Sequence, residues 1–70
     1  MVDYYKLKKG SVIEEYGYGY TIRSTIITDI ERVSTKGGTV YEFEAITENN
    51  GLISYMVGGI YTPNLNVINY

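Results

Sequence analysis

Apolar and polar residues alternate with a period of two over several stretches of this chain, which is the pattern of half-buried β-strands. Ile, Val, Tyr and Thr dominate these stretches, whereas Ala occurs once and Leu three times. β-Branched and aromatic residues favour strands, and Gly, Asn and the single Pro63 punctuate the pattern. The sequence therefore predicts an all-β chain with no linker or internal repeat, and residues 1–70 form a single small domain.

The clearest predicted hairpin surrounds Asn49-Asn50-Gly51, because an Asn-Gly pair tolerates the positive φ values of tight turns. Its strands run from about Thr39 to Glu48 and from Leu52 to Val57. If Asn50 and Gly51 are the two central turn residues, Ala45 faces Met56 and Ile46 faces Tyr55. This register predicts two faces, with Phe43, Ala45 and Met56 on one and Glu44, Ile46, Ile53, Tyr55 and Val57 on the other.

The segment from Tyr20 to Val33 fits two structures. Its isoleucines could line one side of a helix near Ser24–Ser34, with Ser24 as the N-cap and Gly37 beyond the end, which would make the fold α+β. Its many β-branched residues favour a strand instead, forming a hairpin with Thr39–Thr47. An even-numbered loop in that hairpin places Ile26, Ile30, Tyr41 and Phe43 on the inner face and Asp29, Glu31, Glu42 and Glu44 on the outer face.

Both ends of the chain add short elements. Lys8 to Ile13 predicts a turn that enters a first strand, and Thr62 to Ile68 predicts a tight turn that closes into a short last strand. The opening Lys9-Gly10-Ser11-Val12, the two central hairpins and the Pro63-Asn64-Leu65 turn before Val67-Ile68 together resemble the SH3-like small barrels. The resemblance implies a five-to-six-stranded antiparallel barrel or strongly curled sheet. It carries no binding site across, because the chain lacks tryptophan and long basic loops.

Seventy residues bury only about 60% of the surface of the unfolded chain. With no Cys and no His, neither disulfides nor a structural zinc site can reinforce the core, so self-association into a homodimer is one way to add burial.

No stretch approaches the roughly 20 apolar residues that cross a bilayer, and Met1 to Gly10 lacks the apolar middle of a signal peptide. We expect a cytoplasmic protein without a membrane partner, in the host cytoplasm if a phage encodes it.

The sequence argues against an enzyme. The carboxylate pairs Glu14-Glu15 and Glu42 with Glu44 have no nucleophile or oxyanion donor legible beside them. Gly17 and Gly19 are followed by neither Lys-Ser nor Lys-Thr, so they do not form a phosphate-binding loop. We expect no cofactor and no catalytic residue.

Tyr16-Gly17-Tyr18-Gly19-Tyr20 is the most unusual stretch. In a continuous strand its three rings point one way and its two glycines the other, where a ligand or backbone could approach closely. Three roles remain open for the rings: packing within the sheet, contact with a partner protein, or stacking on nucleobases.

Asp29, Glu31, Glu42 and Glu44 form a predicted acidic patch in a chain of net charge −2. Three interpretations remain open: a solvated surface, a contact with a basic partner, or a calcium or magnesium site, although the spacing matches no EF-hand loop. Like charges directly across strands destabilise a sheet unless something offsets them, which indicates a basic partner or neighbouring Lys and Arg side chains.

Two functions follow as hypotheses. In the first, the protein is an interaction module that binds a partner protein or a second copy through Tyr16, Tyr18, Tyr20, Asp29, Glu31, Glu42, Glu44 and Tyr55. Met1 begins what reads as a complete chain, and its usage leans to Ile, Asn, Tyr and Lys, as in small accessory proteins of AT-rich bacteria and their phages. Such phage proteins often act as stoichiometric inhibitors of host machinery, including defence nucleases. In the alternative, the tyrosines hold single-stranded nucleic acid or a nucleotide beside Lys6, Lys8, Lys9 and Arg23.

Overall fold

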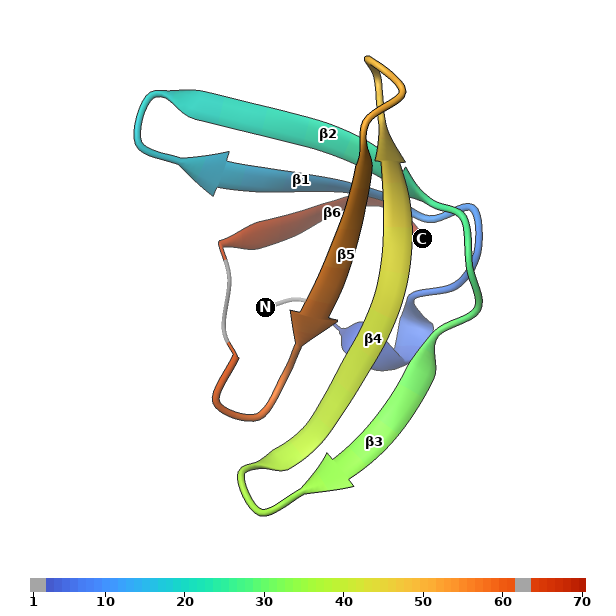
Figure 1. Cartoon of the computed structure of the whole chain (residues 1–70), viewed down its shortest axis with the longest axis vertical. Coiled ribbons are helices and arrows are strands. Elements are labelled where there is room, and N and C mark those ends of the chain that lie inside the picture. The colour runs from blue at the N-terminus through green and yellow to red at the C-terminus, as the bar shows by residue number, and fades with distance from the viewer. Residues whose placement is uncertain (1–2, 62–63) are drawn as a thin grey trace.

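A computed structural model, which describes residues 3–61 and 64–70, shows six antiparallel strands in one strongly curled sheet that forms a half-barrel (Figure 1). A short 3₁₀ helix, Tyr4–Lys6, precedes the sheet. The strands are β1 (Val12–Gly17), β2 (Tyr20–Ile26), β3 (Glu31–Thr35), β4 (Gly38–Thr47), β5 (Leu52–Val57) and β6 (Leu65–Asn69). The predicted all-β fold is therefore confirmed. No helix among the described residues is long and apolar enough to cross a membrane.

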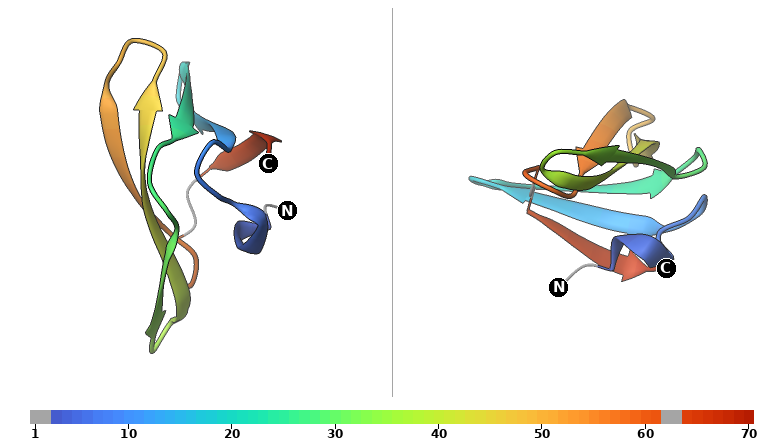
Figure 2. Two further views of the ribbon diagram at one scale, coloured as in Figure 1. Left: turned by 90° about the vertical axis from the view of Figure 1, so that its right-hand side faces the viewer. Right: turned by 90° about the horizontal axis from the view of Figure 1, so that it is seen from below.

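The long strand β4 organises the sheet. One edge of β4 pairs with β3 and then with β2, and its other edge pairs with β5. β1 joins β2 to β6, so that β3, β4 and β5 form one wall, β1 and β6 the other, and β2 the link between them (Figure 2). Between β2 and β3 the chain stays on β4, because the Ile27 amide donates to the Glu44 carbonyl (2.9 Å) and the Glu44 amide donates to Thr28 Oγ1 (3.0 Å).

The core lies on the inner face of this half-barrel. Ile13, Ile26, Ala45 and Val57 are fully buried there, and the Phe43 ring stacks on Tyr55 with centroids 5.4 Å apart. The 3₁₀ helix adds Tyr4 and Tyr5, whose rings lie 5.6 and 6.0 Å from that of Tyr41. The predicted inner-face set is confirmed, since Ile26, Tyr41 and Phe43 are buried and Ile30 packs against them.

The segment from Tyr20 to Val33 contributes strands, so the predicted alternative of a helix near Ser24–Ser34 is wrong. Its β-branched residues lie in β2 and β3, which both pair with β4, one before and one after a bend in the chain. This pairing provides hydrogen-bond partners for the backbone N–H and C=O groups without a helix. The first and last strands are confirmed as β1 and β6. The predicted turn at Pro63 falls partly outside the described residues.

The register predicted for the β4–β5 hairpin is wrong by three residues, an odd number, so the two faces of β5 are exchanged. Within this turn only Asn50 adopts a positive φ, 63°, and it is the last residue of a three-residue loop. The loop is closed by a hydrogen bond in which the Thr47 amide donates to the Gly51 carbonyl (2.8 Å). Phe43 therefore pairs with Tyr55 and Ala45 with Ile53. Because side chains alternate, the odd-numbered residues of β5 join the inner face and Met56 moves to the outer face.

The tyrosine-glycine run is a hairpin and not one continuous strand. Tyr18 and Gly19 form its turn, with Gly19 at φ 77°, and the chain reverses so that Gly17 pairs with Tyr20 and Tyr16 with Thr21. Residues directly opposite each other share a face, so Tyr16 and Tyr20 lie on opposite faces of the hairpin. The prediction of three rings on one side is wrong because Gly19 permits a tight turn that the alternation pattern did not reveal.

Candidate functional site: an acidic hollow on the outer face

A hollow of about 340 Å³ lies on the outer side of β3, β4 and β5. The structure brings together around it all four residues of the acidic patch, Asp29, Glu31, Glu42 and Glu44. Four more residues line the hollow, Thr28, Phe43, Ser54 and Tyr55, and of these the sequence had indicated only Tyr55 as a contact residue. The correct register would have identified Ser54, because it pairs with Glu44 on the neighbouring strand.

The electrostatics of this hollow are unfavourable for the chain alone. Glu31 and Glu42 occupy directly opposite positions on β3 and β4, where two like charges destabilise a sheet. No Lys or Arg lines the hollow in the described ranges. The neighbouring Arg32 belongs to the opposite face, where its guanidinium lies 4.6 Å from the centroid of the Tyr5 ring.

A metal ion is a poor match for these carboxylates. Within residues 3–61 and 64–70, no group of three or more Asp, Glu, His or Cys side chains is arranged to hold one. Calcium needs about six to eight oxygen ligands at short range. The carboxylates are instead distributed around the hollow as single charges.

Tyr55, a predicted contact residue, lines the hollow but presents little exposed surface to it. Its side chain is in the core, 8% exposed, and its hydroxyl donates to Glu15 Oε1 (2.9 Å). The corrected register of β5 is the reason, because it turns Tyr55 inward. Burial, and next the hydrogen bond to Glu15, raises the pKa of Tyr55 to about 12.

This raised pKa predicts a loss of stability at alkaline pH. Between the ordinary value of 10.0 and about 12, the unfolded chain loses the Tyr55 proton before the folded chain does, so stability is fully present below pH 10 and falls as the pH approaches 12. Urea unfolding of Tyr55→Phe should show a shallower alkaline decline than wild type. Tyr18→Phe, the same change at a fully exposed tyrosine, should follow wild type, and equal slopes for all three proteins would refute the assignment.

The other predicted contact tyrosines are exposed. Tyr18, at the hairpin tip, is fully exposed, and Tyr16 and Tyr20 are 40% and 49% exposed. We predicted that a ligand or backbone could approach the glycines of this run closely. At Gly17 a side chain of the same protein does so, because the Tyr20 ring occupies the space where a Cβ on Gly17 would lie. Tyr16 and Tyr18 line a separate, smaller hollow with Asn64.

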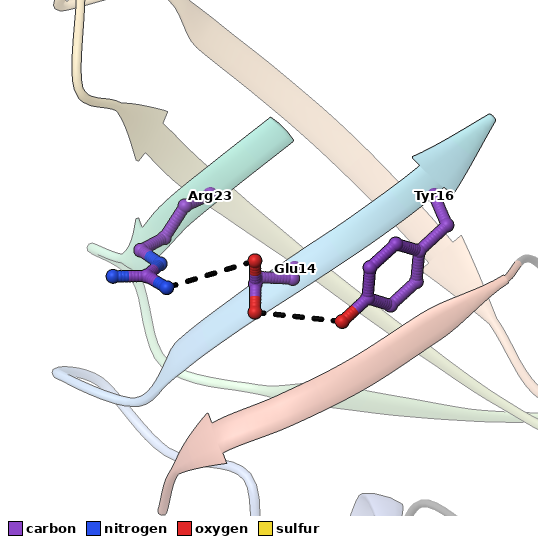
Figure 3. A network of polar contacts seen from close by, with 3 residues as sticks. All are labelled: Glu14, Tyr16 and Arg23. Carbon is purple, nitrogen blue, oxygen red and sulfur yellow. Dashed lines mark hydrogen bonds and ion pairs between the residues drawn. The ribbon is translucent and has the colours of Figure 1, made fainter. Parts of the chain in front are cut away.

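Of the basic residues in the nucleic-acid hypothesis, Arg23 lies near Tyr16, whereas the lysines lie elsewhere. Arg23 lies 3.6 Å from Glu14, whose other carboxylate oxygen accepts a hydrogen bond from the Tyr16 hydroxyl (Figure 3). Lys6 approaches the ring of Tyr70, 6.0 Å from its centroid. Lys8 and Lys9 precede β1 whereas Tyr18 follows it, so six strand residues, about 20 Å, separate them.

Comparison of the chain with protein-family models, curated proteins and solved structures found no match.

Proposed function

We propose that the protein is a small non-enzymatic interaction module that binds a basic surface of a partner protein through the acidic patch. The facing pair Glu31 and Glu42 carries the proposal. A chain that needed these positions only for solubility would gain stability from a Lys at either one. Retaining two like charges there costs folding stability, and binding to cationic side chains offsets that cost in the complex.

Apolar groups beside the patch supply contact area. Met56 pairs with Glu42 across β5 and β4, and its side chain is 46% exposed. Interfaces commonly combine such apolar contacts with charges that set orientation and speed of association. Tyr16 and Tyr18 offer rigid aromatic area at a second place, the tip of the β1–β2 hairpin.

The strand order supports an SH3-like identity for the fold as part of this proposal. β6, β1, β2, β4 and β5 follow one another in the sheet, and β3 continues β2 after a bend. The biological role we propose is inhibition of host machinery in the cytoplasm by a phage-type accessory protein. Such an inhibitor acts by binding its target one to one and needs no catalytic activity.

Charge reversal within the patch tests this function. With the tagged chain as bait in an extract of its source cell, a specific partner is recovered and purified, and its affinity is measured by calorimetry. Glu44→Lys should weaken binding roughly tenfold or more, and Glu42→Lys combined with Glu44→Lys should abolish it, because like charges then meet the partner. Glu48→Lys is the matched control, since Glu48 is exposed in the neighbouring loop and does not line the hollow.

Stability provides an independent readout of the same variants. Glu42→Lys should raise the free energy of unfolding by roughly 0.2–1 kcal/mol, because the new Lys faces Glu31. Greater stability together with unchanged partner affinity would mean that the patch is only solvated. Binding of a single-stranded oligonucleotide that falls steeply with salt and is lost on changing Lys8 and Lys9 to Glu would favour the nucleic-acid alternative.

A further inference from the structure

Three strands of the half-barrel have one edge that lacks a neighbouring strand along its whole length in the described residues: β3, β5 and β6. Natural sheets protect such edges by shortness, charged residues or bulges. β3 has five residues and carries Glu31 and Arg32, and β6 has five residues and pairs with β1 through a register shift. β5 has six residues, Leu-Ile-Ser-Tyr-Met-Val, with no charge, no Pro and no bulge in its pairing with β4. It is therefore the least protected edge.

The backbone of β5 presents a defined set of free groups. Residues of an antiparallel pair alternate between those that bond to the opposite strand and those whose N–H and C=O point away. The bond from the Thr47 amide to the Gly51 carbonyl places the odd-numbered residues of β5 in the bonded positions. Leu52, Ser54 and Met56 therefore direct their N–H and C=O groups outward, and all three side chains are exposed.

These three residues are complementary to themselves. When β5 pairs antiparallel with an identical strand about a twofold axis at Ser54, Leu52 lies opposite Met56 of the second copy and Ser54 lies opposite Ser54. Every outward N–H and C=O of the three residues then finds a partner. Leu52 of one copy, which is 61% exposed in the single chain, then contacts Met56 of the other copy, which is 46% exposed.

We propose that the protein forms a twofold dimer by pairing β5 with β5 of a second copy, which makes one continuous sheet. The pairing uses the same edge in both copies, so assembly stops at two. Repulsion between the acidic patches is weak, because the two β4 strands lie three strand spacings apart, about 14 Å, beyond the Debye length of about 8 Å. The dimer presents both patches on one outer face, and its formation does not depend on the proposed partner.

Sedimentation velocity of the purified chain over a wide concentration range tests the proposal. We expect a reversible monomer–dimer equilibrium, from 7.9 kDa to twice that mass, with micromolar or weaker affinity because the interface is small. Ser54→Lys should yield monomers, because two Lys side chains would face each other across the axis. The same substitution at Ser34, an exposed residue on β3, should leave the dimer intact.

A mixture of two variants tests the register itself. Ser54→Lys and Ser54→Glu should each be monomeric, and an equimolar mixture should form a heterodimer, because residue 54 faces residue 54. Circular dichroism of each variant establishes that it is folded. A wild-type chain that stays monomeric at all concentrations, a dimer that Ser54→Lys leaves unchanged, open-ended association beyond two copies, or a mixture that stays monomeric would each overturn the proposal.

Discussion

Replacement of Gly58 by alanine is expected to destabilise the fold by roughly 3 kcal/mol or more, a large part of the total stability of a domain of this size. Gly58 is buried directly after β5 with φ 106°, a conformation that residues with a Cβ rarely adopt. A Cβ there would lie 2.6 Å from the Thr39 carbonyl oxygen and 3.3 Å from the ring of Tyr41. Because the oxygen belongs to the backbone of β4, the strand itself would have to move.

Gly10→Ala is the matched control for this effect. Gly10 has φ 97°, close to that of Gly58, but a Cβ at Gly10 would meet nothing within 4 Å. Its substitution should cost only the conformational strain, roughly 1–2 kcal/mol. Urea unfolding followed by circular dichroism gives both values, and equal losses for the two variants would show that Thr39 does not confine Gly58.

Ile13→Ala is the second large expected effect, at roughly 2–5 kcal/mol. Ile13 is fully buried on β1, next to β2 and β6, and truncation of its side chain would leave a cavity where the two walls of the half-barrel meet. Ile60→Ala removes the same atoms from a side chain that is 75% exposed and should change stability by less than about 1 kcal/mol.

The same urea measurements compare these isoleucine variants. A thin core has few contacts to compensate a cavity, so Ile13→Ala should also lower the thermal midpoint clearly. Similar losses for Ile13→Ala and Ile60→Ala would contradict the assignment of Ile13 to the inner face.

The strands and the acidic patch could be predicted because they depend on local patterns. β-Branched residues at Thr25 to Val33 favoured strands, and the even-numbered loop at Lys36-Gly37 correctly placed Glu31 and Glu42 on the outer face. Period-two alternation then assigned the core residues Tyr41 and Phe43.

The errors arose where one backbone conformation decides the path of the chain. Asn50 ends a three-residue loop where a two-residue turn at Asn50 and Gly51 was predicted, and the resulting three-residue shift in register places Tyr55 in the core. Gly19 reversed the chain between Tyr16 and Tyr20, although the spacing of the tyrosines was equally compatible with one strand. Alternation alone does not encode loop length or turn position, which the backbone conformations of Asn50 and Gly19 decide here.

Chemical-shift mapping is the most direct test of the proposed docking through the acidic patch. The isotope-labelled chain is titrated with the recovered partner, and the amide resonances are followed residue by residue. We expect the largest changes at residues that line the hollow, among them Thr28, Asp29, Glu31, Glu42, Glu44 and Ser54. Changes centred on Lys8 and Lys9, with the residues around the hollow unaffected, would contradict it.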